Sequence, residues 1–233
     1  MKVTAIVLLA GKSTRFDSDS PKQFFEINGK PLVYYSIGAF ESSIVVDEIV
    51  LVTRNEFIDL VYNIVKQYNF KKVVNIVKGG NTRQKSVANG LKVVSNDTDL
   101  VIIHDGARPL VAQDIISRCI KDAENYGAST AAIPCADTTV TSKDGILIDD
   151  KLNRDTLWSV QTPQCFNLSL LKKAHKEAKE DNASDDATLV KNIGHDVCLV
   201  MGSKTNLKVT TKDDLPIVEA IIEKNLRKWT FTK

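Results

Sequence analysis

Close pairs of cysteines are absent from this chain. Its four cysteines are Cys119, Cys135, Cys165 and Cys198, far apart and with no CxxC pair among them. Structural zinc sites and redox motifs need such pairs, so both are disfavoured, and scattered thiols are typical of a reducing cytosol. We interpret all four as small buried hydrophobic residues.

The sequence also lacks an apolar run long enough to span a membrane. The run at residues 3–10 follows Lys2 as the core of a signal peptide would, but it leads into Gly11-Lys12-Ser13 and not into a small-residue cleavage site. The sequence therefore predicts a cytoplasmic protein with no membrane partner.

Basic residues are numerous but nowhere dense. Lysine and arginine total 31 against 29 acidic residues, which leaves a net charge of +2 and no basic stripe, so nucleic acid is not an expected partner. With 233 residues, 43% of them hydrophobic, the chain can bury a substantial core. We expect a single domain over residues 1–233.

Two familiar phosphate-binding motifs are incomplete. Gly11-Lys12-Ser13 imitates the end of a Walker A loop, but the glycine that this motif needs at position 6 is Ile6. The second and third glycines of the dinucleotide fingerprint would fall at Ser13 and Phe16. A P-loop NTPase and a dehydrogenase are therefore disfavoured.

The first loop is nevertheless suited to an anion. The unbroken apolar run at residues 5–9 is typical of a strand buried on both faces, so the loop lies at the carboxyl edge of a sheet. Gly11 allows backbone N–H groups to approach a phosphate, and Arg15 and Lys22 add two cations. The alternative is an ordinary strand-to-helix connection with solvated basic residues.

Apolar segments alternate with amphipathic ones along the chain. Strands are predicted at 3–9, 48–53, 72–78, 100–104, 129–134 and 197–201, and helices at 32–40, 57–68, 83–94, 115–126, 170–180 and 215–228. This alternation predicts an α/β fold, with a Rossmann-like, mostly parallel sheet flanked by helices.

Residues 137–158 depart from that rhythm. Apolar and β-branched residues at 138–141 and 146–148 flank Lys143-Asp144-Gly145, a pattern typical of a β-hairpin. A two-stranded ribbon has little stability alone, so it should pack on a second copy of the chain. We expect a protruding dimerisation arm and a homodimer.

Charged and polar residues follow the predicted strands. The segments 79–83 and 105–109 should share one cleft with the first loop, because the carboxyl ends of parallel strands meet at one edge. Asn81 is the predicted N-cap of the next helix, and Ser86 lies in its first turns. The free N–H groups of this helix start could hold a carbonyl or a phosphate.

Asp105 and Lys208 each have two possible interpretations. Asp105 could hold a Mg²⁺ ion that a nucleotide triphosphate brings, or it could form a structural ion pair with Arg108 or a helix cap. Lys208, on a short strand-like segment, could face an anion or could be an ordinary surface lysine.

The order and spacing of several motifs resemble the 2-C-methyl-D-erythritol 4-phosphate cytidylyltransferase family along nearly the whole chain. These motifs are Leu9-Ala10-Gly11 with Arg15, Pro21-Lys22-Gln23, Gly79-Gly80 with Arg83 and Ser86, His104-Asp105-Gly106-Ala107-Arg108-Pro109, Asp137-Thr138, Arg154 with Leu157-Trp158, Gln161-Thr162-Pro163-Gln164, Ser184-Asp185-Asp186-Ala187 and Asn206-Leu207-Lys208-Val209-Thr210. Two positions differ from the usual pattern: Lys12-Ser13-Thr14 in the first loop, and Asn81 in place of an acidic residue.

The resemblance implies a site for each substrate. CTP would bind near Ala10, Gly11, Arg15, Lys22, Gly80, Ser86 and Asp105, with Mg²⁺ beside Asp105. The polyol phosphate would be held by Arg108, Thr162 and Lys208, with Thr138 and Arg154 reaching in from the partner's arm. The residues expected to act in catalysis are Arg15, Lys22, Lys208 and Arg154.

The expected reaction is an in-line attack by a substrate phosphate oxygen on the α-phosphorus of CTP, which needs no covalent enzyme intermediate. One alternative is ribitol-5-phosphate cytidylyltransferase, against which the segment 105–109 favours methylerythritol phosphate. A second alternative is a non-catalytic nucleotide-binding subunit. Retention of Arg15, Lys22, Asp105 and Lys208 together argues against it.

Overall fold

The computed structural model describes residues 1–11, 16 and 21–230, and side chains are described as far as residue 224. A seven-stranded sheet forms the centre, in the order β11-β7-β10-β6-β1-β4-β5. Its strands are β1 (Val3–Leu8), β4 (Glu48–Thr53), β5 (Val73–Lys78), β6 (Leu100–Asp105), β7 (Ala128–Pro134), β10 (Trp158–Asn167) and β11 (Cys198–Met201). β10 runs antiparallel to both neighbours and the other pairings are parallel, so the predicted mostly parallel α/β fold is confirmed.

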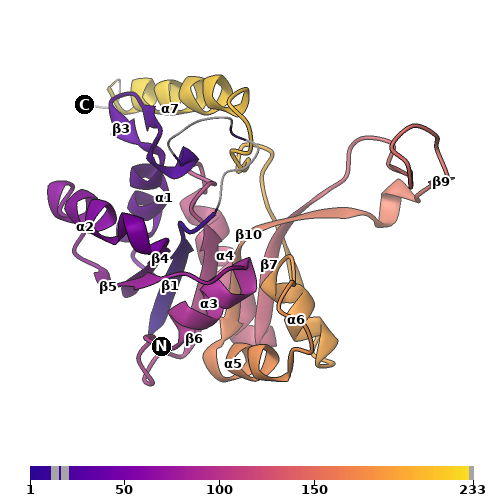
Figure 1. Cartoon of the computed structure of the whole chain (residues 1–233), viewed down its shortest axis with the longest axis horizontal. Helices are drawn as coiled ribbons and strands as arrows, with labels where there is room; N and C mark the ends of the chain where they lie inside the picture. Colours follow the sequence, from indigo (N-terminus) through magenta and orange to yellow (C-terminus); the bar gives the residue numbers. More distant parts are fainter. Residues whose placement is uncertain (12–15, 17–20, 231–233) are drawn as a thin grey trace.

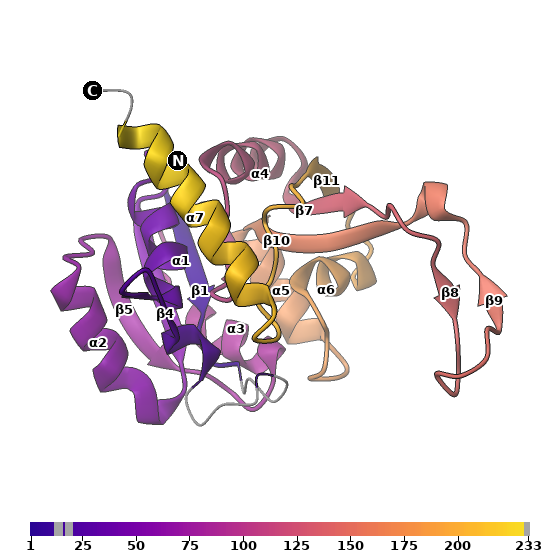
Figure 2. The same cartoon turned by 90° about the horizontal axis from the view of Figure 1, so that it is seen from above.

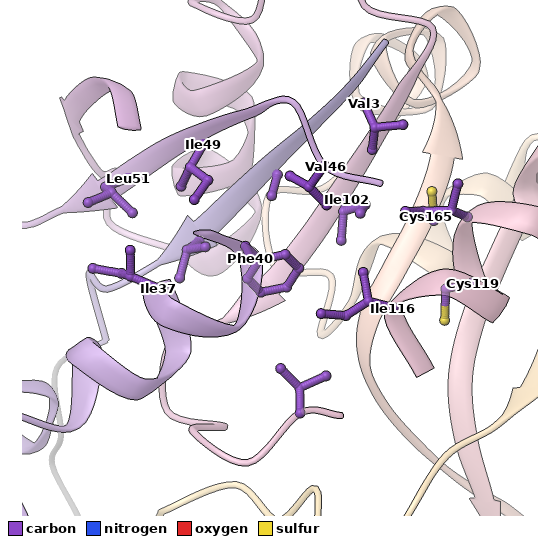
Figure 3. Packing of buried hydrophobic residues seen from close by; sticks show 14 of the residues in the cluster. Val3, Ile37, Phe40, Val46, Ile49, Leu51, Ile102, Ile116, Cys119 and Cys165 are labelled. Carbon is purple, nitrogen blue, oxygen red and sulfur yellow. The ribbon is translucent and has the colours of Figure 1, made fainter. Parts of the chain in front are cut away.

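Helices cover both faces of the sheet (Figure 1). They are α1 (Leu32–Glu41), α2 (Ile58–Gln67), α3 (Arg83–Leu91), α4 (Gln113–Tyr126), α5 (Leu168–Glu177), α6 (Asp186–Asn192) and α7 (Asp214–Thr230). The core on one face packs α1, α2 and α4 against the strands, and Figure 3 shows Phe40 and Ile116 within it. The core on the other face joins α3, α5 and α6 to the sheet. β1 therefore contributes apolar side chains to the cores on both faces of the sheet, as the unbroken apolar run at residues 5–9 predicts.

One strand of the central sheet and one helix that covers it were absent from the sequence prediction. β10 contains Pro163 and three buried polar residues, Gln161, Thr162 and Gln164, so it lacks the apolar pattern of a strand. Its register also shifts between Val160 and Gln164, where it pairs with β7. α6 is a helix of only seven residues, too short for a clear helical period.

The cysteine prediction is correct for two residues and wrong for two. Cys119 and Cys165 are buried, whereas Cys135 and Cys198 are half-buried, and all four are free thiols. Burial raises the pKa of the Cys119 thiol to about 12, which keeps it protonated and inert. Among the described helices, none combines the length and the apolar character that a membrane span requires.

Residues 137–158, the last of which begins β10, form an arm that extends away from the sheet (Figure 2). Its two short strands, β8 (Val140–Thr141) and β9 (Asp150–Lys151), pair in antiparallel fashion. The prediction that residues 146–148 form the second strand is wrong, because they lie in the connecting turn. Asp144 Oδ1 accepts hydrogen bonds from the N–H groups of Ile146 and Leu147, at 2.8 and 2.9 Å, and these bonds stabilise a wider turn.

Candidate active site

A pocket of about 370 Å³ opens at the carboxyl edge of the sheet, beside β1 and β6 and the start of α3. It is lined by Leu8, Ala10, Gly11, Lys22, Gln23, Gly80, Asn81, Thr82, Arg83, Ser86, Asp105, Ala107, Lys208 and Thr210. The three loops that the sequence places at this edge thus meet in one cavity.

The other candidate residues lie outside this lining. Thr162 Oγ1 accepts from the backbone N–H of Asp105, and Arg108 Nη1 donates to the Asn206 carbonyl. Thr138 and Arg154 are on the arm, where Arg154 Nη1 donates to the carbonyl of Ala136 at 3.2 Å. Arg15 lies outside the described residues.

The start of α3 forms one wall of the pocket. Its N-cap is Thr82, whose Oγ1 accepts from the Lys85 N–H at 3.1 Å, so the prediction of Asn81 as the cap is wrong by one residue. The backbone of Thr82 is extended immediately before the helix, which is the geometry of an N-cap. Ser86 Oγ accepts from the Gly80 N–H at 3.1 Å and donates to the Thr82 carbonyl at 2.9 Å. These bonds fold the segment before α3 back over the start of the helix.

Gly80 is required by this fold-back. A Cβ atom at this position would lie 2.3 Å from the Cβ of Lys85, so any larger residue would push the segment out of place. Because Gly80 has no side chain, its backbone can pack against Lys85 and form part of the pocket wall.

The opposite wall is held by Lys22 and Gln23. Lys22 begins the short 3₁₀ turn η1 (Lys22–Phe24) and is only 8% exposed, and its Nζ donates to the Val209 carbonyl at 2.6 Å. Gln23 Nε2 donates to the carbonyls of Leu9 and Gly11, at 2.9 Å each. A buried lysine and a fixed loop backbone therefore face the same cavity.

Asp105 ends β6 between two cations. Its Oδ1 accepts from Arg83 Nε at 3.3 Å and its Oδ2 from Lys208 Nζ at 2.7 Å. Burial alone would raise the pKa of Asp105, but the charges of Arg83 and Lys208 outweigh burial and hold the pKa well below its usual range. The ion pair with Arg108 considered from the sequence is not the one found, because Arg108 Nη1 donates to the Asn206 carbonyl at 2.7 Å.

Lys208 lies on an extended segment without strand pairing, which corrects its predicted strand-like setting. Its side chain is 40% exposed, yet its ammonium group is bound to Asp105. Lys208 therefore pairs with a carboxylate of the pocket lining.

Arg83 extends the charge network away from the pocket. Its Nη1 donates to Asp186 Oδ2 at 2.6 Å, and Asp186 Oδ1 lies 2.8 Å from His175 Nε2. Asp186 is fully buried at the start of α6, and although burial raises its pKa, the charge of Arg83 brings the pKa below its ordinary value. This contact between Arg83 and Asp186 was not predicted from the sequence. The only signal was the Ser184-Asp185-Asp186-Ala187 motif, to which no role was attached.

The donor set at Asp105 suits a metal that arrives with a ligand. Among the described residues, no group of three or more His, Cys, Asp or Glu side chains could hold a metal ion. Asp105 is the carboxylate in the described pocket lining. A nucleotide-bound Mg²⁺ keeps several waters and needs only one or two protein oxygens, so the site fits such an ion and not a resident metal cage.

Residues 3–224 match the family model of 2-C-methyl-D-erythritol 4-phosphate cytidylyltransferase (IspD). The chain belongs to this family. Curated proteins of that name from Clostridium novyi and Clostridium botulinum (strain Langeland) are 45% and 42% identical to it. The first alignment covers 95% of this chain and 97% of the relative, and the second covers 96% and 98%.

Solved structures of the IspD family have the same fold. The 4-diphosphocytidyl-2C-methyl-D-erythritol synthase of Anaerococcus prevotii superposes with a TM-score of 0.83 at 27% identity, over 95% of this chain and 96% of that one. The cytidylyltransferase of Thermus thermophilus gives a TM-score of 0.76 at 31% identity, over 95% and 98%. The family expected from the sequence motifs is thus confirmed.

Proposed function

We propose that this chain transfers the cytidylyl group of CTP to 2-C-methyl-D-erythritol 4-phosphate in the non-mevalonate isoprenoid pathway. The products are 4-diphosphocytidyl-2-C-methyl-D-erythritol and pyrophosphate. The observation that carries this proposal is a pocket lined by Lys22, Arg83 and Lys208, the last two of which pair with Asp105, in a chain of the IspD family.

The reaction needs charge and alignment more than acid–base chemistry. A phosphate oxygen of the polyol substrate forms a bond to the α-phosphorus, while the bond from that phosphorus to the β-phosphate bridge oxygen breaks and pyrophosphate leaves. The attacking phosphate is already ionised near neutral pH, so no basic residue is required. Lys22 and Lys208, together with Arg15 from the first loop, would stabilise the charge that develops on the phosphates.

The nucleotide would lie between the first loop and the start of α3. Backbone groups at Ala10 and Gly11 would contact the nucleoside, and Lys22 the triphosphate. The cytosine would face Gly80, whose backbone position is fixed by Ser86. Backbone donors and acceptors at a fixed spacing can distinguish the edge of cytosine from that of another base.

The polyol phosphate would lie toward Lys208 and Arg108. Arg108 Nε is buried and, among the described residues, has no hydrogen-bond partner, so it is available to an anionic ligand. The Thr162 hydroxyl, predicted to contact the same substrate, is bonded to the Asp105 N–H and to the His104 ring. The second candidate is ribitol 5-phosphate, because its phosphate would meet the same cations.

Mg²⁺ would bind with the triphosphate, and Asp105 is the residue that would hold it. Bound there, the ion would supply further positive charge to the reacting phosphates. Lys208 and Arg83 would keep the Asp105 carboxylate ionised and in place.

We also propose that the arm, residues 137–158, joins two copies of this chain, each a single cytoplasmic domain. The exposed fractions of Ile146, Leu147 and Ile148 at its tip are 84%, 69% and 71%. Trp158 and Val160 at its base are 37% and 42% exposed. A series of exposed apolar side chains is typical of an interaction surface. In a symmetric dimer, each arm would bury these side chains against the partner.

Nucleotide selectivity tests the placement of the base. We expect kcat/KM for CTP to exceed the values for UTP and ATP by about a hundredfold or more, because other bases leave buried backbone groups unpaired. Initial rates of pyrophosphate release with each triphosphate, at saturating methylerythritol phosphate and Mg²⁺, measure this directly. Equal use of ATP and CTP would contradict a cytosine site at Gly80.

A further inference from the structure

His104 is a buried histidine directly behind the pocket. It is the penultimate residue of β6 and is 0% exposed, and its ring contacts Phe40 of α1 at a centroid distance of 5.0 Å. Successive side chains of a strand point to opposite faces, so His104 faces the core while Asp105 faces the pocket. His104 is not among the residues that line the pocket, so it can influence the reaction only through other groups.

The hydrogen bonds of His104 assign its tautomer. Nε2 lies 3.0 Å from the carbonyl of Arg108, and a carbonyl oxygen can only accept, so Nε2 carries the proton. Nδ1 lies 3.1 Å from Thr162 Oγ1, which already accepts from the Asp105 N–H at 3.0 Å. The hydroxyl proton of Thr162 is therefore directed at the bare Nδ1, and this bond orients the ring.

The carbonyl that His104 holds belongs to the turn that carries Arg108. This turn is closed by the Arg108 N–H, which donates to the Asp105 carbonyl at 2.9 Å. The guanidinium of Arg108 is fixed separately, by its bond to the carbonyl of Asn206. Without the imidazole N–H, the Arg108 carbonyl would lose its bond to β6, and the bond of the Arg108 N–H to the Asp105 carbonyl would remain to tie this backbone to the strand.

We propose that His104 is a positioning residue, which fixes Arg108 toward the phosphate of the polyol substrate while Thr162 fixes the ring. This role rests on the function proposed above. The contact acts on the polyol side of the site. The groups assigned to CTP are held by other bonds: Lys22, Gly80 and Ser86 by the contacts given above, and the Asp105 carboxylate by Arg83 and Lys208. Loss of the His104 contact should therefore impair the use of methylerythritol phosphate more than the binding of CTP.

Two substitutions separate this role from simple support of the core. His104→Leu removes both polar contacts, whereas His104→Gln can return an amide N–H to the Arg108 carbonyl. We expect His104→Leu to lower kcat/KM for methylerythritol phosphate about 30-fold, mainly through loss of the hydrogen bond that holds the Arg108 carbonyl, with KM for CTP within about twofold of the wild-type value. We expect His104→Gln to recover about tenfold of that loss. His195→Gln, at a histidine that bonds the Asp196 carbonyl far from the pocket, is the matched control and should leave both constants unchanged.

Equal losses in the Leu and Gln variants, or parallel changes in KM for both substrates, would overturn the proposal. If His104→Leu does not fold, ¹⁵N NMR of the wild-type chain at neutral pH tests the proposal, because it reports which ring nitrogen of His104 carries the proton. A protonated Nε2 with a bare Nδ1 supports the proposal, and the opposite tautomer refutes it. A wild-type chain that binds CTP but never transfers its cytidylyl group to methylerythritol phosphate would refute the proposed function instead, and the NMR result would still report the ring geometry.

Discussion

Lys22→Ala is expected to lower kcat by about a hundredfold or more, with a smaller effect on KM for CTP. The lysine is buried in the pocket wall, where a cation acts on the reacting phosphates with little screening by water. The ammonium charge stabilises the transition state more than bound CTP, because negative charge shifts to the leaving pyrophosphate. The substitution should therefore lower kcat more than it changes KM. Steady-state rates over a range of CTP concentrations separate the two constants.

Lys92→Ala is the control, because Lys92 is exposed at the end of α3, does not line the pocket, and donates its ammonium hydrogen to Asn89 Oδ1. The control should retain full activity. Thermal unfolding of both variants checks that the buried substitution has not simply unfolded the chain. Near-normal turnover in a folded Lys22→Ala enzyme would show that Lys22 does not take part in the reaction.

Arg154→Ala is expected to inactivate the enzyme, and a mixture of inactive chains is expected to recover activity. The arm that carries Arg154 extends away from the sheet of its own chain (Figure 2), and Arg154 is not part of the described pocket lining. In a dimer joined by its arms, Arg154 would therefore complete the polyol-phosphate site of the partner. A mixed dimer of a Lys22→Ala chain and an Arg154→Ala chain contains one site with an intact lysine and an intact arginine.

The measurement combines subunit exchange with an assay. Two affinity tags purify the mixed dimer after exchange, and its rate is compared with that of each parent. About half of the wild-type rate per dimer is expected, because one of two sites is whole. A purified mixed dimer that stays inactive would show that Arg154 serves its own chain, and chains that remain monomeric would contradict the arm as a dimer contact.

Local patterns predicted those parts of the fold that depend on burial of apolar residues. The strands at 3–9 and 48–53 were predicted almost to the residue because both faces of each strand are apolar. β10 escaped prediction because its buried polar residues are paired by tertiary contacts, such as Gln164 with Thr130 and with the backbone of Asp186. Such contacts join positions far apart in the chain and have no local period.

In the candidate site, too, the sequence predicted the positions of loops but not the contacts between distant residues. The segments 79–83 and 105–109 were placed at one sheet edge because parallel topology dictates where strands end. The partners of Asp105 could not be read from spacing, because Arg83 and Lys208 are 22 and 103 residues away along the chain. The role of His104 likewise depends on Thr162, which β10 brings beside β6.

The most direct test of the proposed function is pyrophosphate release by the wild-type chain with CTP, Mg²⁺ and each of the two polyol phosphates. We expect kcat/KM for 2-C-methyl-D-erythritol 4-phosphate to exceed that for ribitol 5-phosphate by about a hundredfold or more, with the diphosphocytidyl product identified by mass spectrometry. Preferential use of ribitol 5-phosphate, or CTP binding without turnover of either polyol, would contradict the account.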